Sequence, residues 1–354
     1  MTMRRLINLK RVEARRIYLT YAVVIAAFVI CQFMSSTKIL SSSMRGMLVP
    51  ICAYMVMSVS LNLVVGISGE LSLGHAGFMS VGAFSGVAAA ILMQNIIPFA
   101  PLRLALAMII AAVFAAVAGF LIGIPVLRLK GDYLAIVTLA FGEIIKSLLN
   151  NFYMGIDSGG IHISMLSDTT RLLKGGRLII RGPMGISGIQ KIATFGAGFV
   201  LVMISLMIVF NLVNSRSGRA FMAIRDDRIA AESVGLDITK YKMMAFVTSA
   251  ALAGAAGALF AMNYSTIVAN KFDFNTSILI LVFVVLGGQG NMLGGIIAAA
   301  VLTVLPEKLR QFSDYRMLLY AIILIVMMLA TNNAEIKYFL SKLNPFRKHK
   351  EEAE

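Results

Sequence analysis

Ionisable residues inside apolar stretches are the side chains of this sequence most able to act on an ion or a polar ligand. Glu143 and Lys146 stand three residues apart, which places them on one face of a helix and favours pairing. In a helix that crosses a membrane, charged groups usually face the bundle interior or water. The pair could therefore line or close a translocation path. The alternative that we favour is a structural ion pair near the outer interface, where Lys146 extends its ammonium group to water.

A second polar group lies in the segment Gly69–His75, which leads into an apolar run. Glu70 brings a carboxylate and His75 an imidazole, and the glycines permit a tight, non-helical backbone. Two interpretations stay open: a loop at a pore or gate, or an interfacial turn with both side chains in water. The full set of candidate pore or gate residues is Asn62, Gly69, Glu70, His75, Glu143, Lys146, Gln289 and Asn291.

Enzymatic chemistry has no candidate residues. The sequence lacks a Gly-x4-Gly-Lys-Ser/Thr phosphate loop, so we do not expect this chain to hydrolyse ATP. Its three histidines are far apart, no Cys/His cluster has the spacing of metal ligands, and no nucleophile–base set is suggested. We therefore expect no catalytic residue, no metal and no cofactor in this chain.

The elements that carry these residues are apolar segments long enough to cross a membrane. The chain of 354 residues is 59% hydrophobic and only 14% charged, whereas about 25% is usual in a soluble domain. Eight runs approach the roughly 20 residues of a span: Ile17–Met34, Met47–Val65, Ala76–Met93, Leu102–Ile124, Tyr133–Leu149, Ala193–Val213, Met243–Met262 and Met317–Ala330. We predict an all-α fold, a polytopic transmembrane helical bundle of about eight full spans plus a broken or re-entrant helical segment.

That additional segment is Ser277–Leu305, which is apolar but interrupted by Gly287–Asn291. Neither piece is a comfortable span alone, so the segment is either one broken span or a re-entrant hairpin. Lys and Arg collect on the cytoplasmic side of membrane proteins. A hairpin places about 19 of them inside and about 12 outside, against about 17 and about 14 for a broken span. We favour the hairpin, with both termini in the cytoplasm.

This orientation divides the chain into a basic N-tail (1–16), a transmembrane region (17–332) and a C-tail (333–354). An external segment (150–192) and a cytoplasmic loop (214–242) are too long and polar to be turns. The net charge of +15 is distributed between the spans, which favours an anionic membrane surface over nucleic acid as its partner. The first apolar run is long for a signal peptide and is followed by no clear cleavage site, so we interpret it as an uncleaved span.

The two polar segments each suggest a docking surface. In the cytoplasmic loop, small and apolar residues recur at helical spacing, which suits a short helix that enters a cleft on a cytoplasmic partner or, equally, one that lies on lipid. In the external segment, a run of cations could engage acidic residues of a soluble binding protein or be a solvated charge run. These cations are Arg171, Lys174, Arg177 and Arg181.

Several long motifs in a fixed order resemble the LivM-type permeases of branched-chain amino acid ABC importers, over roughly residues 45–332. They are Leu61–Gly66, Gly69–Phe78, Leu129–Ile144, Val284–Asn291 with Gly294, and Leu305–Glu307. Ala230-Ala231-x3-Gly235 is similar to the cytoplasmic loop signature of ABC permeases, although Ile229 stands in place of its Glu. The external segment also departs from the family, with about 20 additional residues between Ile161 and Pro183. That insertion leaves open how an external partner is held.

The resemblance implies a multi-pass subunit of the cell inner membrane that forms half of a pore with a second homologous permease. Two cytoplasmic ATPases, which hold ATP and Mg²⁺, would dock on a coupling helix, and a soluble binding protein would dock outside. The coupling-helix candidates are Ala220, Ala223, Ile224, Ala230, Ala231, Glu232 and Gly235. The implied substrates are branched-chain, hydrophobic amino acids. Urea or short amides, or a stand-alone secondary transporter or channel, stay open as alternatives.

Overall fold

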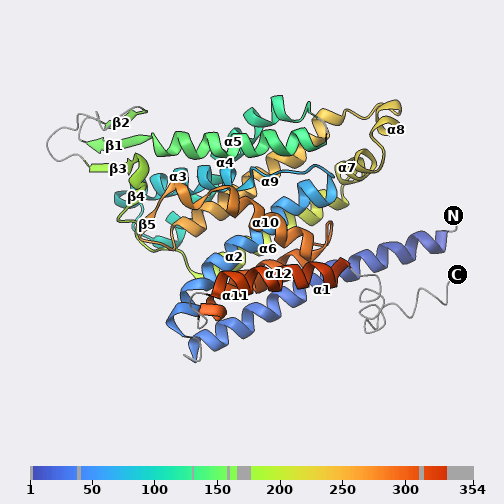
Figure 1. Ribbon diagram of the computed structural model, residues 1–354, viewed down its shortest axis with the longest axis horizontal. Coiled ribbons are helices and arrows are strands. Elements are labelled where there is room, and N and C mark those ends of the chain that lie inside the picture. The colour runs from blue at the N-terminus through green and yellow to red at the C-terminus, as the bar shows by residue number, and fades with distance from the viewer. Residues whose placement is uncertain are drawn as a thin grey trace. The chain divides into compact units, whose positions relative to one another are not determined.

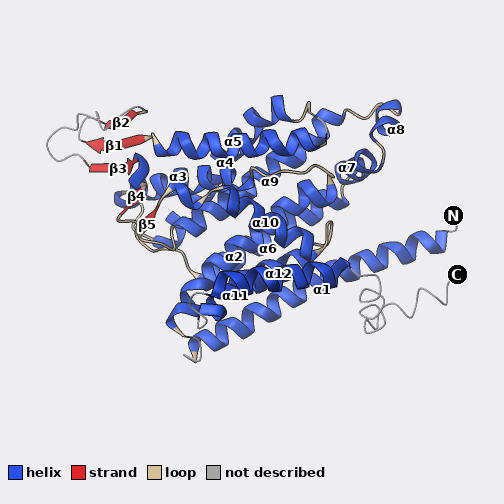
Figure 2. Ribbon diagram, viewed as in Figure 1, coloured by secondary structure: helices blue, strands red, loops and turns tan. Residues whose placement is uncertain are grey.

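The computed structural model describes residues 3–37, 41–129, 131–157, 160–165, 177–310 and 315–332. Helices dominate the described part (Figures 1 and 2). Their bounds are α1 Met3–Ser36, α2 Ser42–Asn62, α3 His75–Leu92, α4 Ala100–Val126, α5 Asp132–Asn150, α6 Phe195–Asn214, α7 Arg216–Asp226, α8 Arg228–Ser233, α9 Ile238–Ala261, α10 Phe274–Gly287, α11 Met292–Lys308 and α12 Arg316–Asn332. Residues up to Ala300 form one compact unit, and those from Val301 form a second.

The predicted polytopic helical bundle is confirmed, with seven candidate spans among the described residues rather than about eight. These are Ile17–Ser36, Ser42–Ile67, His75–Asn95, Ala100–Val126, Phe195–Asn214, Ile238–Ala261 and Ala269–Gly287. Two predicted spans are not among these candidates. Helix α5 carries Asp132, Glu143 and Lys146 within 19 residues, and the apolar part of α12 is limited to Leu318–Leu329.

Helix α9 is the centre of the first unit, because it packs against α2, α3 and α4. Small residues allow the backbones to approach closely, as is usual between membrane helices. A Cβ added at Gly82 of α3 would overlap the backbone of Gly254 in α9. Ala250, Ala253 and Ala256 have no exposed surface. The small residues of α9 therefore form the surface on which the neighbouring helices pack.

A small antiparallel sheet, which an all-α prediction does not include, forms at one end of the bundle. Its five strands, β1 Tyr153–Asp157, β2 Gly160–Ser164, β3 Arg177–Arg181, β4 Ile186–Ser187 and β5 Thr266–Ile267, are ordered β2-β1-β3-β4-β5. Because β5 belongs to the α9–α10 loop and pairs with β4, that loop and the 150–192 segment lie at the same end. Helices α7 and α8 lie at the opposite end of α6 and α9 (Figure 1).

Helices α10 and α11 are joined by the four residues 288–291, in which Gly288 and Gly290 have φ of 89° and 80°. Such angles favour glycine, because a Cβ would be strained there. The expectation that neither apolar piece is long enough to span is wrong for the first. A 3₁₀ turn at Ala269–Lys271 precedes α10, and the combined segment Ala269–Gly287 has 19 residues. The 3₁₀ turn before α10 contacts Asn150 near the sheet, and the turn after α10 contacts Asn62 near α7, so this first piece is long enough to span. Whether α10 and α11 form one broken span or a re-entrant hairpin stays a prediction.

Candidate functional site

The loop between α6 and α9 folds as two short helices rather than the single helix predicted. Ser215 caps α7 by accepting a hydrogen bond from the Gly218 N–H at 3.3 Å. Asp227 begins α8, since its Oδ1 accepts from the N–H groups of Ile229 at 2.9 Å and Ala230 at 3.0 Å. A side-chain oxygen in this position satisfies donors that a helix start leaves unpaired. The bend at Asp227 therefore gives α7 and α8 different orientations.

This bend divides the predicted small-residue face into two parts. Ala220, Ile224 and Ala231 are buried within the chain, and Ile224 and Ala231 cluster with Ile238 of α9. Ala223, Ala230, Glu232 and Gly235 are exposed. Two large apolar side chains that the prediction left out are highly exposed, Ile229 at 81% and Val234 at 76%. A partner that docks here meets α8 rather than the whole predicted face.

Arg225, in the last turn of α7, connects this segment to the end of the α2 span. Its Nη1 donates to the Gly66 carbonyl oxygen at 3.0 Å, while Nε and Nη2 donate to Asp226 Oδ1 at 3.2 and 3.1 Å. Gly66 belongs to a π-helical turn, Leu63–Ile67, that extends α2. A π turn leaves irregular backbone and is frequent at functional sites. The Arg225 fork thus fixes α7 against a deformable part of a membrane helix.

The α10–α11 turn also contacts this end of α2. Asn62 has no exposed surface, and its Oδ1 accepts from the Gly290 N–H at 2.8 Å, whereas its Nδ2 has no partner among the described residues. Asn291 is exposed, and its Nδ2 donates to the Gly287 carbonyl at 3.3 Å. A hollow of about 390 Å³ opens beside these contacts, lined by Val65, Gly66, Gly69, Leu71, Arg225 and Gln289. The structure therefore brings Asn62, Gly69 and Gln289 together.

Glu70 forms an ion pair with Lys242, a residue that the sequence analysis did not single out. The Lys242 side chain is 6% exposed and that of Glu70 is 12% exposed. The interpretation that Glu70 lies in water is therefore wrong. Lys242 directly precedes the apolar run assigned from Met243, so it was counted with the polar loop. Lys242 stands one helical turn before Phe246, which is buried, so the sequence spacing already indicated that Lys242 lies on the buried face of this helix.

His75 is buried away from the hollow, in a polar network that connects four helices. Its Nε2 lies 2.8 Å from Ser60 Oγ, and Ser249 Oγ donates to the Ser60 carbonyl at 2.6 Å. The next residue, Ala76, donates its N–H to Ser277 Oγ at 3.2 Å. His75 thus joins α3 to α2, while Ser249 joins α9 to α2 and the Ala76 N–H joins α3 to α10. A direct role of His75 in a pore stays a prediction.

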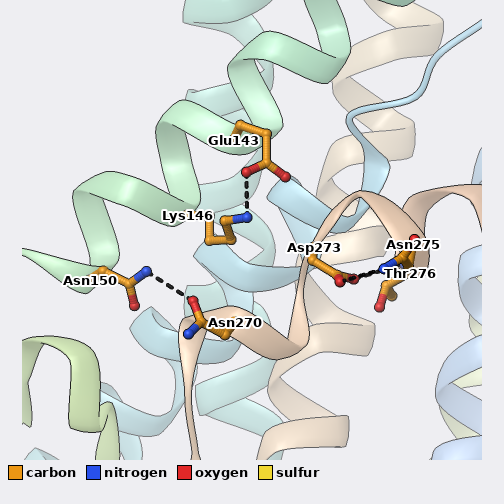
Figure 3. Close-up of polar contacts among 7 residues, drawn as sticks. All are labelled: Glu143, Lys146, Asn150, Asn270, Asp273, Asn275 and Thr276. Atoms are coloured by element: carbon orange, nitrogen blue, oxygen red, sulfur yellow. Dashed lines mark hydrogen bonds and ion pairs between the residues drawn. The ribbon is translucent and has the colours of Figure 1, made fainter.

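The Glu143–Lys146 ion pair is present (Figure 3), in the half of α5 that leads into β1. The side chains are 39% and 23% exposed, respectively. One turn further along, Asn150 Nδ2 donates to Asn270 Oδ1 at 3.0 Å, next to the start of α10. There, Asp273 caps the helix by accepting from the Thr276 N–H at 3.0 Å. The pair is therefore remote from the Arg225 hollow, and its place on a translocation path stays a prediction.

The predicted external cations are only partly placed by the structure. Arg171 and Lys174 lie outside the described residues. Arg177 begins β3, without a described side chain, and Arg181 ends that strand with an exposed side chain. Their docking role stays a prediction.

Comparisons with known proteins identify the family of this chain. The model of the permease component of branched-chain amino acid transport systems matches residues 43–331. The LivM permease proteins of the high-affinity branched-chain amino acid transport systems of Salmonella typhimurium and Escherichia coli are each 38% identical, over 289 and 287 residues. Both alignments cover 78% of this chain and 66% of the relative. A probable LivM of Methanocaldococcus jannaschii is 27% identical over 286 residues, covering 72% of this chain and 78% of that protein.

The chain spans about two thirds of the length of the first two relatives, and no solved structure matches it. The family match covers most of the described helices, from α2 to α12. This chain belongs to the family of permease components of branched-chain amino acid transport systems.

Proposed function

We propose that this chain is the transmembrane permease subunit of an ATP-driven ABC importer and forms half of a translocation pathway for branched-chain amino acids. Family membership and the LivM relatives support the class and the substrate. The observation that carries the proposal is the α7–α8 segment, which exposes Ile229 and Val234 at one end and binds Gly66 through Arg225 at the other. It joins a docking surface to a membrane helix.

The proposed assembly places the α7–α8 end in the cytoplasm and the sheet end outside, in the cell inner membrane, with both termini cytoplasmic. Two ATPase subunits, which hold ATP and Mg²⁺, dock on α8, and a soluble binding protein docks near the sheet. A second, homologous permease completes the pathway. This chain acts as a pore subunit and leaves hydrolysis to its partners.

In this mechanism, ATP binding closes the ATPases and displaces α7–α8. Because Arg225 holds the Gly66 carbonyl, the displacement reaches the π-helical turn and the α10–α11 turn beside it. Both border the 390 Å³ hollow, which would change shape as the permease halves alternate access.

The test of the function is uptake of labelled L-leucine by proteoliposomes that contain this chain, its permease partner, the ATPases and the binding protein. We expect uptake that requires internal ATP and both kinds of partner. Uptake that continues without any ATPase would identify a stand-alone transporter and end the proposal. ATP-dependent uptake of urea in place of leucine would overturn the substrate.

Replacing Ile229 with Asp is expected to remove ATPase binding. The new carboxylate would lose its water in the contact without gaining a partner, which reduces affinity by about tenfold or more. Co-purification of the ATPase with the tagged permease measures the change. Ile163→Asp is the matched control, because Ile163 is 61% exposed in β2 at the opposite end and should leave binding unchanged. Equal binding by both variants would show that α8 is not the docking surface.

Replacing Arg225 with Gln is expected to separate hydrolysis from transport. The variant loses the guanidinium fork that bonds Gly66 and Asp226 but leaves the exposed α8 surface intact. A hydrogen bond from a charged donor contributes about 1.5–3 kcal/mol, so leucine uptake should fall by about tenfold or more while ATPase activity persists. Arg219→Gln, an exposed arginine of the same helix, is the control. A parallel loss of both activities would indicate a docking role instead.

A further inference from the structure

Arg103 is a buried cation that no part of the proposed function uses. It lies in the first turn of α4, at the sheet end of the bundle, and is only 5% exposed. Its Nη2 donates to Gln190 Oε1 at 2.7 Å, and its Nε has no hydrogen-bond partner among the described residues. The described residues provide no carboxylate within ion-pair distance of this guanidinium. The positive charge of the Arg103 guanidinium is thus met by the neutral side-chain amide of Gln190 rather than by a carboxylate.

Such an arrangement is unfavourable unless another negative group is present. Arginine stays protonated in proteins, so it cannot relieve its burial by losing the charge. An unpaired buried ion costs several kcal/mol even after the surroundings relax. The positive end of the 27-residue helix α4 adds to the local potential. These terms together favour an anion beside Arg103.

The structure also provides space for one. A small cavity of about 20 Å³ is lined by Arg103, Gln94, Gln190, Ile91, Gly188 and Met262, among others. A cavity needs about 10–15 Å³ to hold one water molecule, so this partly open space takes a small anion. Because Gln190 Oε1 is occupied by Arg103, the amide of Gln190 still has donors to offer, as does that of Gln94.

We propose that Arg103, Gln94 and Gln190 form a binding site for one small anion, either a halide such as chloride or a single carboxylate group. The site lies between the end of α3, the start of α4 and the segment that follows β4, so an occupant would tie the outer ends of two membrane helices to the sheet region. The proposal is independent of the substrate and of the ATPase partners.

The experiment compares thermal unfolding of the full-length chain in lipid nanodiscs in sodium chloride, acetate and gluconate at equal ionic strength. Gluconate carries its carboxylate on a bulky six-carbon chain and serves as the weakly binding control. We expect a midpoint about 2–4 °C higher in chloride or in acetate than in gluconate, as for an anion present at about ten times its Kd. A chloride effect identifies a halide site, and an acetate effect identifies a carboxylate site. Equal midpoints in all three salts overturn the proposal.

Three variants connect the effect to this site. Arg103→Gln should lose the difference between salts, whereas Lys191→Gln, which removes an exposed cation next to Gln190, should keep it. Gln190→Glu supplies a carboxylate beside Arg103, so it should be stable in gluconate and insensitive to chloride or acetate. This variant tests the site even if Arg103→Gln does not fold. A salt effect of full size in either Arg103→Gln or Gln190→Glu would show that the anion binds elsewhere.

Discussion

Replacing Lys242 with Met is expected to reduce the free energy of unfolding by about 3–5 kcal/mol, because it leaves the Glu70 carboxylate buried without its partner. Methionine fills a similar volume, so the loss of charge rather than a cavity causes the effect. The loop Ser68–Gly74 is held against α9 by this pair and should detach first. Thermal unfolding in detergent or nanodiscs measures the change, together with faster proteolysis of the loop.

The double variant Glu70→Leu/Lys242→Met separates the buried charge from the packing. Replacing both members of a buried ion pair with apolar residues is often neutral or stabilising, so the double variant should recover most of the lost stability. Lys308→Met, in another part of the chain, provides a control for removing a lysine as such. If the double variant were as unstable as Lys242→Met alone, the ion pair would not be the reason for the effect.

The membrane helices were the most predictable part of the fold, because lipid imposes a length and an apolar composition on them. The run Ala76–Met93 corresponds to α3 at His75–Leu92, and Leu102–Ile124 lies within α4 at Ala100–Val126. Helix α5 was assigned as a span on its apolar residues, but its three ionisable groups reduce its apolar character. Counting apolar runs without weighing their charged residues therefore overestimated the number of spans.

The sheet could not be predicted for a different physical reason. Its strands have five residues or fewer, and β4 and β5 have two residues each. Such segments are too short to show a period of two, and their pairing joins segments far apart in the chain. The length of α10 was likewise underestimated, since the 3₁₀ turn Ala269–Lys271 carries polar residues that hide the extension.

The candidate site was predicted in its residue types but not in its pairs. Glu70 and Gly69 were singled out, yet their partners Lys242 and Arg225 come from α9 and α7, and a single sequence contains no signal for such contacts. Helical spacing indicated a small-residue face in the cytoplasmic loop. Helical spacing could not show that the chain bends at Asp227 and turns part of that face inward. The bend is set by hydrogen bonds from the backbone N–H groups of Ile229 and Ala230 to Asp227, and side-chain spacing does not report such bonds.

Replacing Gly66 with Ala is expected to remove most transport activity, because no Cβ can be accommodated at this position. A Cβ there would overlap Asn62 Oδ1 and the backbone nitrogen of Gly290, two atoms that hydrogen-bond to each other at 2.8 Å. The α10–α11 turn would have to move, and the Gly66 carbonyl would shift away from Arg225. Overpacking of this kind costs about 1–3 kcal/mol, enough to change a conformational equilibrium by tenfold or more.

The matched control is Gly46→Ala, in the first turns of the same helix α2, where an added Cβ would meet no atom within 4 Å. That variant should transport leucine at the unmodified rate and unfold at an equal or slightly higher temperature, since alanine favours helices over glycine. Gly66→Ala should still reach the membrane and bind the ATPases, because α8 is unchanged, while leucine uptake falls. Full uptake by Gly66→Ala would mean that the contact among Gly66, Asn62 and Gly290 opens freely during transport. The π-helical turn would then not transmit the motion of α7.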